Sequence, residues 1–152
     1  MEKTTSIYEL PMSVIINGQA LSVAEVVAIA RHFAQVTLGS DSVARILAAR
    51  AVIDTIAAEE RKVYGVTTGF GHLSRVRIKH AQLEELQHNL LRSHAAGVGE
   101  PLTEEVTRAV MLLLAASLAR GNSGVRVEIV KTLLTMLNLS LIHISEPTRQ
   151  AE

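Results

Sequence analysis

The strongest constraint on the fold is a helical spacing of apolar residues between positions 43 and 60. Aliphatic side chains recur there at the 3.6-residue period of an α-helix, so they share one face. Arg45 and Glu59 fall on the opposite, wet side. The pattern predicts an amphipathic helix that must bury one face against other elements. That face consists of Val43, Ile46, Ala49, Ile53, Ile56 and Ala57.

Further segments carry the signals of helices. Ser22 and Glu25 fit a capping box, in which each side chain bonds the other residue's backbone amide. Gly121 is typical of a helix C-terminus, and Ser123 of an N-cap. Asn138 is expected to take the left-handed conformation after the last helix. The helices are predicted at about 23–35, 81–93, between Thr103 and Gly121, and from Ser123 to about Leu137.

A short β element is expected near the start of the chain. Residues 13–16 are rich in β-branched side chains, and Asn17-Gly18 follows them. Asn-Gly is typical of a two-residue hairpin turn because both residues accept positive φ. The sequence therefore predicts a small hairpin closing near Leu21. The expected fold class is mainly α, with a small β-hairpin near the start.

Composition limits the class of protein. The chain has 152 residues, 48% hydrophobic and only 3% aromatic, which predicts one domain with an aliphatic core. Fifteen basic residues balance fifteen acidic ones, so no nucleic-acid or anionic-membrane partner is indicated. The absence of Cys excludes disulfides and thiolate metal sites. The start lacks a signal-peptide pattern, and the longest apolar stretch, 109–119, is too short to span a membrane. A cytoplasmic setting is expected.

The helical pattern stops at a glycine-rich loop, residues 64–71. Three glycines there could cradle a phosphate, but a Walker loop ends in Gly-Lys-Ser/Thr, whereas His72 follows Gly71. Two interpretations stay open on residue grounds. The loop is a tight surface turn, or Tyr64 at its edge acts as an acid or base, which a tyrosine can do when its reference pKa of about 10 is lowered.

Four histidines lie between positions 72 and 94, at gaps of eight, eight and six residues. Helical metal sites usually place two histidines four residues apart, so no metal site is predicted. Glu84 lies four residues from both His80 and His88, and the three are expected on a solvated polar face. His94 differs because it stands where a helix meets the small-residue break at 95–99, a place that often lines a pocket.

Taken together, Tyr64-Gly65-Val66-Thr67-Thr68-Gly69-Phe70-Gly71 resembles the signature loop of the histidine and aromatic amino-acid ammonia-lyases. The resemblance continues in order through the blocks 86–102, 123–126 and 136–138. It extends over roughly residues 14 to 138. Several ordered blocks at plausible spacing are far more specific than one glycine-rich loop.

The resemblance implies a mainly α-helical homotetramer that builds each active site from more than one subunit. In such enzymes the amine of a small amino-acid substrate adds to a methylidene-imidazolone group formed from Ala-Ser-Gly, a β-proton is removed, and ammonia leaves. The resemblance makes Tyr64 the base and makes His94, Ser93 and Asn89 substrate-binding residues. It also implies a mobile lid loop that includes Gly65, Thr67, Thr68, Gly69, Phe70 and Gly71.

The substrate class rests on two pairs of residues. Ser93-His94 is similar to the histidine-specific form, whereas Thr67-Thr68 is more typical of the aromatic types. The expected reaction is elimination of ammonia from L-histidine to give urocanate, a step of histidine catabolism. The alternatives are a tyrosine or phenylalanine ammonia-lyase, a non-catalytic helical interaction module, and a phosphate-binding enzyme that uses the glycine-rich loop.

The last residues do not continue the pattern. Leu139 to Arg149 have neither a helical period nor a turn signal, and they resemble the translation of a transposon-end sequencing adapter. We therefore expect residues 1–138 to be the incomplete amino-terminal part of a lyase domain and residues 139–152 to be a non-native tail. No Ala-Ser-Gly occurs in the chain, so this chain alone is expected to be inactive.

Overall fold

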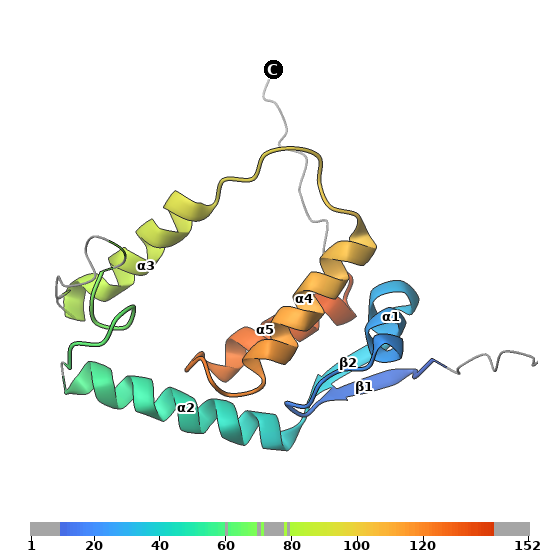
Figure 1. The fold of residues 1–152 in the computed structure, drawn as a ribbon, viewed down its shortest axis with the longest axis horizontal. Coiled ribbons are helices and arrows are strands. Elements are labelled where there is room, and N and C mark those ends of the chain that lie inside the picture. The colour runs from blue at the N-terminus through green and yellow to red at the C-terminus, as the bar shows by residue number, and fades with distance from the viewer. Residues whose placement is uncertain (1–9, 60, 70, 72–77, 79, 142–152) are drawn as a thin grey trace, which may run out of the picture.

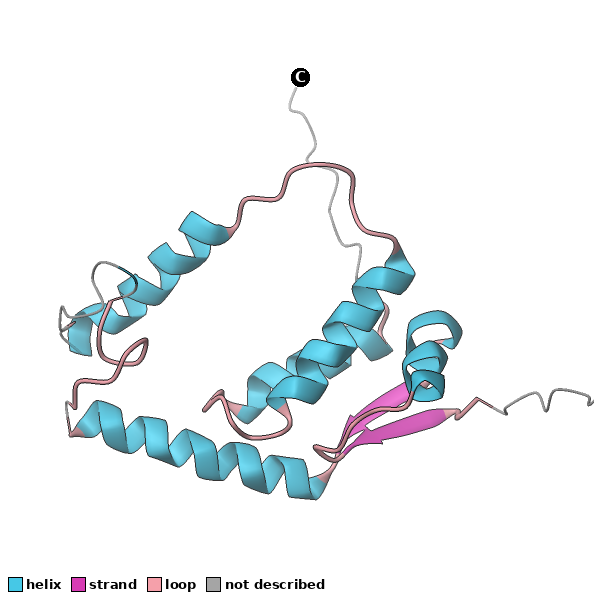
Figure 2. Ribbon diagram, viewed as in Figure 1, coloured by secondary structure: helices cyan, strands magenta, loops and turns pink. Residues whose placement is uncertain are grey.

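The computed structural model describes residues 10–59, 61–69, 71, 78 and 80–141 (Figures 1 and 2). Helices dominate this part of the chain, which confirms the mainly α prediction. No helix in it is long and apolar enough to cross a membrane. The elements are β1 (Ser13–Ile16), α1 (Val23–His32), β2 (Gln35–Leu38), α2 (Ser40–Ala58), α3 (His80–His94), α4 (Glu104–Leu118) and α5 (Val127–Asn138).

The predicted hairpin is wrong, because β1 pairs with β2 in parallel and α1 forms the crossover between them. Val14 lies opposite Val36, and Ile16 opposite Leu38. Asn17-Gly18 does turn the chain: the Asn17 Oδ1 accepts a bond from the Gln19 amide at 3.1 Å, and Gly18 has φ 82°. The turn leads into the capping box of α1 instead of back along β1, so the pairing strand comes only after the helix.

The capping box at the start of α1 is confirmed. The Ser22 hydroxyl accepts from the Glu25 amide at 3.2 Å, and the Glu25 carboxylate accepts from the Ser22 amide at 2.7 Å. The helix ends at His32, three residues before the predicted end, because Phe33 takes the left-handed conformation with φ 56°. After that turn β2 begins at Gln35. The Gln35 amide bonds the Met12 carbonyl at 3.1 Å.

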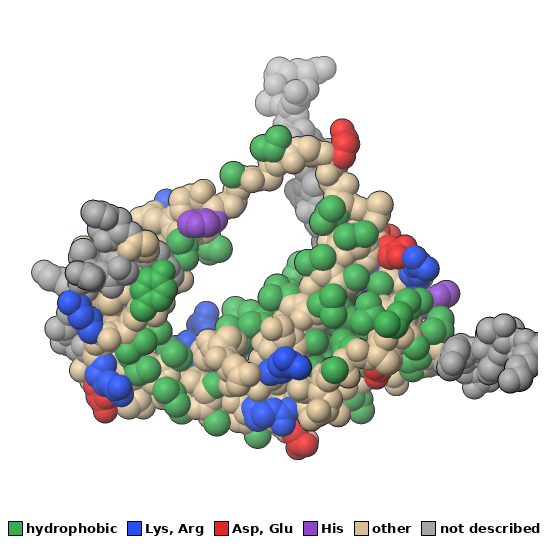
Figure 3. All heavy atoms as spheres, viewed as in Figure 1, with side chains coloured by type: hydrophobic (Ala, Val, Ile, Leu, Met, Phe, Trp, Pro, Cys, Tyr) green, Lys and Arg blue, Asp and Glu red, His purple; other side chains and the backbone are tan. Residues whose placement is uncertain are grey.

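The core lies where α1, α4 and α5 pack together beside the sheet. Its centre is aliphatic, as the composition predicts, with Ile29, Leu112 and Val130 fully buried. Helix α3 contributes no residue to this core and stands apart from it (Figure 1). Hydrophobic side chains also gather on the outer face near α4 (Figure 3), where Val110 and Leu113 are exposed.

A buried arginine ties two helix ends to this core. The Arg108 Nε and Nη2 donate to the Ile29 carbonyl at 3.0 and 2.9 Å, and its Nη1 donates to the Leu137 carbonyl at 2.9 Å. The guanidinium also lies 4.4 Å from the centre of the Phe33 ring. Burial lowers the pKa of Arg108, and the neighbouring Glu104 carboxylate acts in the opposite direction. Arg108 thus satisfies carbonyls near the ends of α1 and α5.

Asn138 joins α5 to the sheet and does not take the predicted left-handed conformation. Its side-chain amide donates to the Val36 carbonyl at 2.8 Å and accepts from the Val36 amide at 2.9 Å, as a neighbouring strand would. Ser140 is left-handed instead, with φ 54°. The amides of Ser140 and Leu141 bond the carbonyls of Leu137 and Met136, at 3.2 and 3.0 Å. This is a Schellman ending, and its left-handed position is most often glycine.

The turn between α4 and α5 packs directly on α2. Ser123 does not cap the last helix as predicted, because α5 begins at Val127 with Arg126 at its N-cap. Gly121 has φ 77°, and a Cβ there would lie 2.6 Å from the Arg45 Cβ and 2.7 Å from the Arg45 carbonyl carbon. Only glycine fits so close to a neighbouring backbone in this conformation.

Replacing Gly121 with alanine should lower the free energy of unfolding by about 2 kcal/mol or more. Left-handed strain costs about 1–2 kcal/mol and overpacking about 1–3 kcal/mol. Urea unfolding of the 152-residue chain, followed by far-UV circular dichroism, measures the change. Gly99 is the matched control, since it also has a positive φ, 103°, and a Cβ there meets nothing within 4 Å. An equal loss in Gly99→Ala and Gly121→Ala would show that the α2 contact is not the cause.

Candidate functional site

Tyr64 stands in a tight turn that follows α2. The amides of Val66 and Thr67 both bond the Val63 carbonyl, at 3.1 and 3.0 Å, and Gly65 has φ 71°. The side chain of Tyr64 is 65% exposed. About two thirds of the surface of Tyr64 is therefore open to solvent.

Two buried threonines hold the loop in shape. The Thr67 hydroxyl accepts from the Val63 amide at 3.0 Å and donates to the Arg61 carbonyl. The Thr68 hydroxyl accepts from the Gly65 amide at 3.3 Å and donates to the Gly69 carbonyl at 3.0 Å. Both hydroxyls thus bond the loop's own backbone and hold the turn that carries Tyr64.

The rest of the predicted lid loop is described only in part. Gly69 is buried, and Gly71 has φ 55° with open space where a Cβ would stand. Phe70 lies outside the described residues. The Ile78 amide bonds the Thr67 carbonyl at 3.1 Å, so the chain returns to the loop before α3 begins.

Ser93 and His94 end α3, and both side chains are exposed. The Ser93 hydroxyl donates to the Leu90 carbonyl at 2.9 Å. The His94 Nδ1 lies 2.9 Å from the same carbonyl oxygen and 3.0 Å from the Ser93 Oγ. One backbone oxygen therefore organises both side chains at the helix end.

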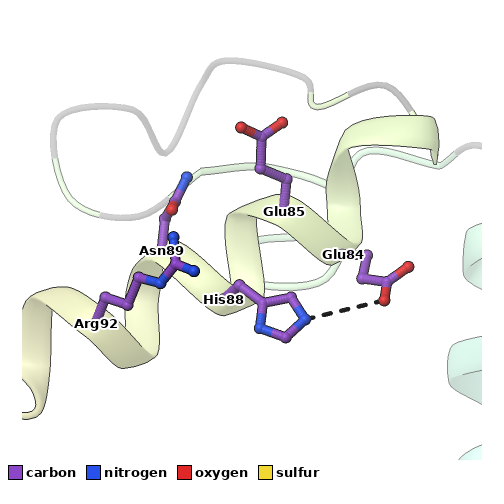
Figure 4. A pocket seen from close by; sticks show the side chains of 5 residues that line it. All are labelled: Glu84, Glu85, His88, Asn89 and Arg92. Atoms are coloured by element: carbon purple, nitrogen blue, oxygen red, sulfur yellow. Dashed lines mark ion pairs between the residues drawn. The ribbon is translucent and has the colours of Figure 1, made fainter.

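Asn89 lines a pocket along α3 (Figure 4). The His88 Nε2 lies 3.9 Å from a carboxylate oxygen of Glu84, and both side chains are largely exposed. Glu84 and His88 thus share a polar face as predicted, whereas the side chain of His80, the third predicted member, lies outside what the structure describes. All five described lining residues come from one helix, α3. They are Glu84, Glu85, His88, Asn89 and Arg92.

The structure does not bring all the predicted site residues together. The Tyr64 loop lies beside the first half of α3, whereas His94 ends that helix (Figure 1). Fifteen helical residues span about 22 Å, so the Tyr64 loop and His94 lie toward opposite ends of α3. Within the described ranges, no group of three or more acidic or histidine side chains could hold a metal ion.

Sequence reasoning missed the anchoring role of Thr67 and Thr68. The resemblance implied that both belong to the lid, but not that their hydroxyls close its turn. A signal was present, because threonine hydroxyls often bond backbone amides a few residues away in turns. The contacts of the His94 ring were harder to predict from the sequence. The only indications were the serine beside it and the carbonyl of the residue four positions earlier in the helix.

The fold and the matched segment define a class of proteins, the aromatic amino acid lyases. The family model described as aromatic amino acid lyase matches residues 21–144. The chain therefore belongs to the aromatic amino acid lyase family.

Individual relatives point the same way. The chain is 49% identical over 125 residues to a histidine ammonia-lyase of Alkaliphilus metalliredigens, covering 82% of this chain and 25% of that one. A histidine ammonia-lyase of Symbiobacterium thermophilum is also 49% identical, over 124 residues, covering 82% and 24%. The chain thus spans about a quarter of the length of the curated relatives it matches.

Solved structures show the same fold. A tyrosine aminomutase from Streptomyces globisporus superposes with a TM-score of 0.80 at 35% identity, covering 84% of this chain and 24% of that one. A histidine ammonia-lyase from Trypanosoma cruzi superposes with a TM-score of 0.76 at 43% identity, covering 83% and 25%. The helical scaffold described above is therefore the ammonia-lyase fold.

Proposed function

We propose that this chain is the amino-terminal segment of an enzyme that eliminates ammonia from L-histidine to give urocanate. The observation that carries the proposal is the 49% identity to histidine ammonia-lyases over 125 residues. The pair Ser93-His94, which resembles the histidine-specific form, supports the same substrate. In the proposed enzyme the chain acts in histidine catabolism, as part of a cytoplasmic homotetramer.

Tyr64 and His94 have different roles in this proposal. Tyr64 removes the β-proton of the substrate, and its exposed position on a turn held by Thr67 and Thr68 supports that role. His94 contacts the substrate ring from the end of α3, with Ser93 beside it and Asn89 one turn earlier. The two groups lie toward opposite ends of α3. For both to contact one substrate, either the lid loop moves toward His94 or a second subunit supplies one of the two residues.

The residues present do not fit the prosthetic group that the family implies. Methylidene-imidazolone forms from Ala-Ser-Gly, and these 152 residues contain no such tripeptide. The chain therefore supplies a base and substrate contacts but not the electrophile, and we propose that it is inactive by itself.

The full-length enzyme, expressed from the complete gene at the source locus, tests the proposal. We expect it to release ammonia from L-histidine with formation of urocanate, and the 152-residue chain assayed alongside to release none. Urocanate is followed by its ultraviolet absorbance, and ammonia by a coupled assay. Exclusive turnover of tyrosine or phenylalanine would refute the substrate assignment, and turnover by the short chain would refute its inactivity.

A tyrosine substrate is the second candidate. The tyrosine aminomutase superposes with a higher TM-score than the Trypanosoma cruzi histidine ammonia-lyase, 0.80 against 0.76, and Thr67-Thr68 resembles the aromatic types. The higher sequence identity to the histidine enzyme, 43% against 35%, favours histidine. The same assay with L-tyrosine separates the two candidates.

We also propose that residues 139–152 are a non-native tail. Ser140 supports this, because it holds a left-handed position that glycine usually fills. The family match itself runs to residue 144, inside this segment. The nucleotide sequence beyond Asn138, read from the source DNA, decides whether these residues belong to the gene.

A further inference from the structure

The end of α3 contains a three-centre arrangement around one carbonyl oxygen. The Leu90 carbonyl oxygen accepts a hydrogen bond from the Ser93 hydroxyl at 2.9 Å. The same oxygen lies 2.9 Å from the His94 Nδ1. The Ser93 Oγ is itself 3.0 Å from that ring nitrogen. Nδ1 is therefore within hydrogen-bond reach of two oxygens at once, both on its own helix.

These distances select one form of the neutral imidazole ring. A carbonyl oxygen can only accept a hydrogen bond, so a bare Nδ1 at 2.9 Å would set two lone pairs against each other. A protonated Nδ1 donates to the Leu90 carbonyl, and the Ser93 oxygen accepts from the same N–H while its own proton goes to Leu90. All three groups are then satisfied, and the remaining ring nitrogen, Nε2, carries the free lone pair.

We propose that Ser93 is a positioning residue that, with the Leu90 carbonyl, holds His94 in the Nδ1–H tautomer, so that Nε2 is presented as a hydrogen-bond acceptor. The proposal rests on the proposed function in placing His94 beside the substrate. Ser93 then acts only through His94, because its hydroxyl donates to the Leu90 carbonyl and its oxygen accepts from the His94 Nδ1–H. A bond from one ring nitrogen to a backbone carbonyl commonly fixes which nitrogen is free for function.

The tautomer determines which substrate side chains can form a hydrogen bond with His94. An Nε2 acceptor pairs with a ring that carries an N–H or O–H donor, such as an imidazole or a phenol. A phenyl ring offers no donor and would leave Nε2 unpaired. Sites built to bond a substrate N–H or O–H discriminate against analogues without it by about 10⁴–10⁵-fold. The geometry thus favours histidine or tyrosine over phenylalanine.

Nitrogen-15 NMR of the 152-residue chain tests the tautomer directly, without any activity. The chain has six histidines, and the His94 signals are assigned by their loss in His94→Gln. At alkaline pH, we expect Nδ1 to show the pyrrole-type shift of a protonated nitrogen and Nε2 the pyridine-type shift. Ser93→Ala should raise the fraction of the Nε2–H tautomer, and Ser93→Thr, which keeps the hydroxyl, should restore the original ratio.

Kinetics of the full-length enzyme provide the second measurement. Loss of one hydrogen bond is worth about a fivefold change, so Ser93→Ala should raise KM for L-histidine about fivefold with little change in kcat. Ser117→Ala, an exposed serine on α4, is the matched control and should change neither. A pyridine-type Nδ1 in the wild-type chain, or a tautomer ratio unchanged in Ser93→Ala, would overturn the positioning role. If the enzyme instead proves inactive on histidine, the proposed function fails, and the spectrum alone still decides the role of Ser93.

Discussion

Replacing Tyr64 with phenylalanine should lower kcat of the full-length enzyme on L-histidine by about 100-fold or more. A positioned general base contributes about 10²–10⁴-fold to rate, and phenylalanine removes only the hydroxyl that would carry the proton. KM should change little, because the ring and the turn beneath it are retained. The measurement is steady-state formation of urocanate across a range of L-histidine concentrations.

A second variant in the same loop separates chemistry from loop shape. Thr67→Val removes a buried hydroxyl that joins the Val63 amide to the Arg61 carbonyl, and it leaves the phenol in place. Loosening a loop of this kind commonly changes kcat and KM together, unlike loss of a base. A Tyr64→Phe enzyme that keeps more than a tenth of its kcat, or that matches the pattern of Thr67→Val, would remove Tyr64 from the role of base.

The helices could be predicted from the sequence because their signals are local. The period of apolar residues from 43 to 60 lies within one element, and the capping box of Ser22 and Glu25 spans four residues. Ile46 and Ile56 are buried as that pattern requires. Such signals depend on the geometry of one helix and need no knowledge of what it packs against.

The sheet could not be predicted in the same way. The partner of β1 lies beyond a whole helix, and nothing in Asn17-Gly18 shows whether the chain returns at once or after α1. The prediction of a left-handed Asn138 failed for a similar reason. An asparagine after a helix is typical of a left-handed ending. Here its amide is needed at the edge of β2, 102 positions away in sequence, so tertiary contact overrides the local preference.

The candidate site was predicted in its residues but not in its arrangement. The ordered motifs selected Tyr64, Ser93 and His94, yet spacing along the chain cannot show that the loop and the histidine lie at opposite ends of α3. Nor could the sequence show that Ser93 and Leu90 fix the ring of His94. A hydrogen bond from a side chain to a carbonyl four residues back becomes visible only when the helix end is in view.

Arg108 is the residue whose loss should most weaken the fold. Its side chain is 1% exposed, and sequence periodicity gave no reason to expect a charge there. Its guanidinium satisfies the Ile29 and Leu137 carbonyls and lies over the Phe33 ring. We expect Arg108→Met to lower the free energy of unfolding by about 3 kcal/mol. The buried Ile29 carbonyl is left without its partner, at a cost of about 1–3 kcal/mol. The Leu137 carbonyl keeps the Ser140 amide, so loss of its bond to Arg108 and of the Phe33 ring contact adds about 1 kcal/mol more, while removal of a desolvated charge offsets part of the total.

The matched control is another arginine on the same pair of helices. Arg31 of α1 pairs with Glu105 of α4 at 2.6 Å, but its side chain is 58% exposed, and exposed pairs contribute at most about 1 kcal/mol. Urea unfolding of the 152-residue chain should therefore show a small shift for Arg31→Met and a large one for Arg108→Met. Arg108→Lys should fall near the larger loss, since an ammonium keeps the charge but lacks the planar fork that reaches both carbonyls. Equal shifts for the two methionine variants would mean that the carbonyl contacts of Arg108 do not hold the ends of α1 and α5 together.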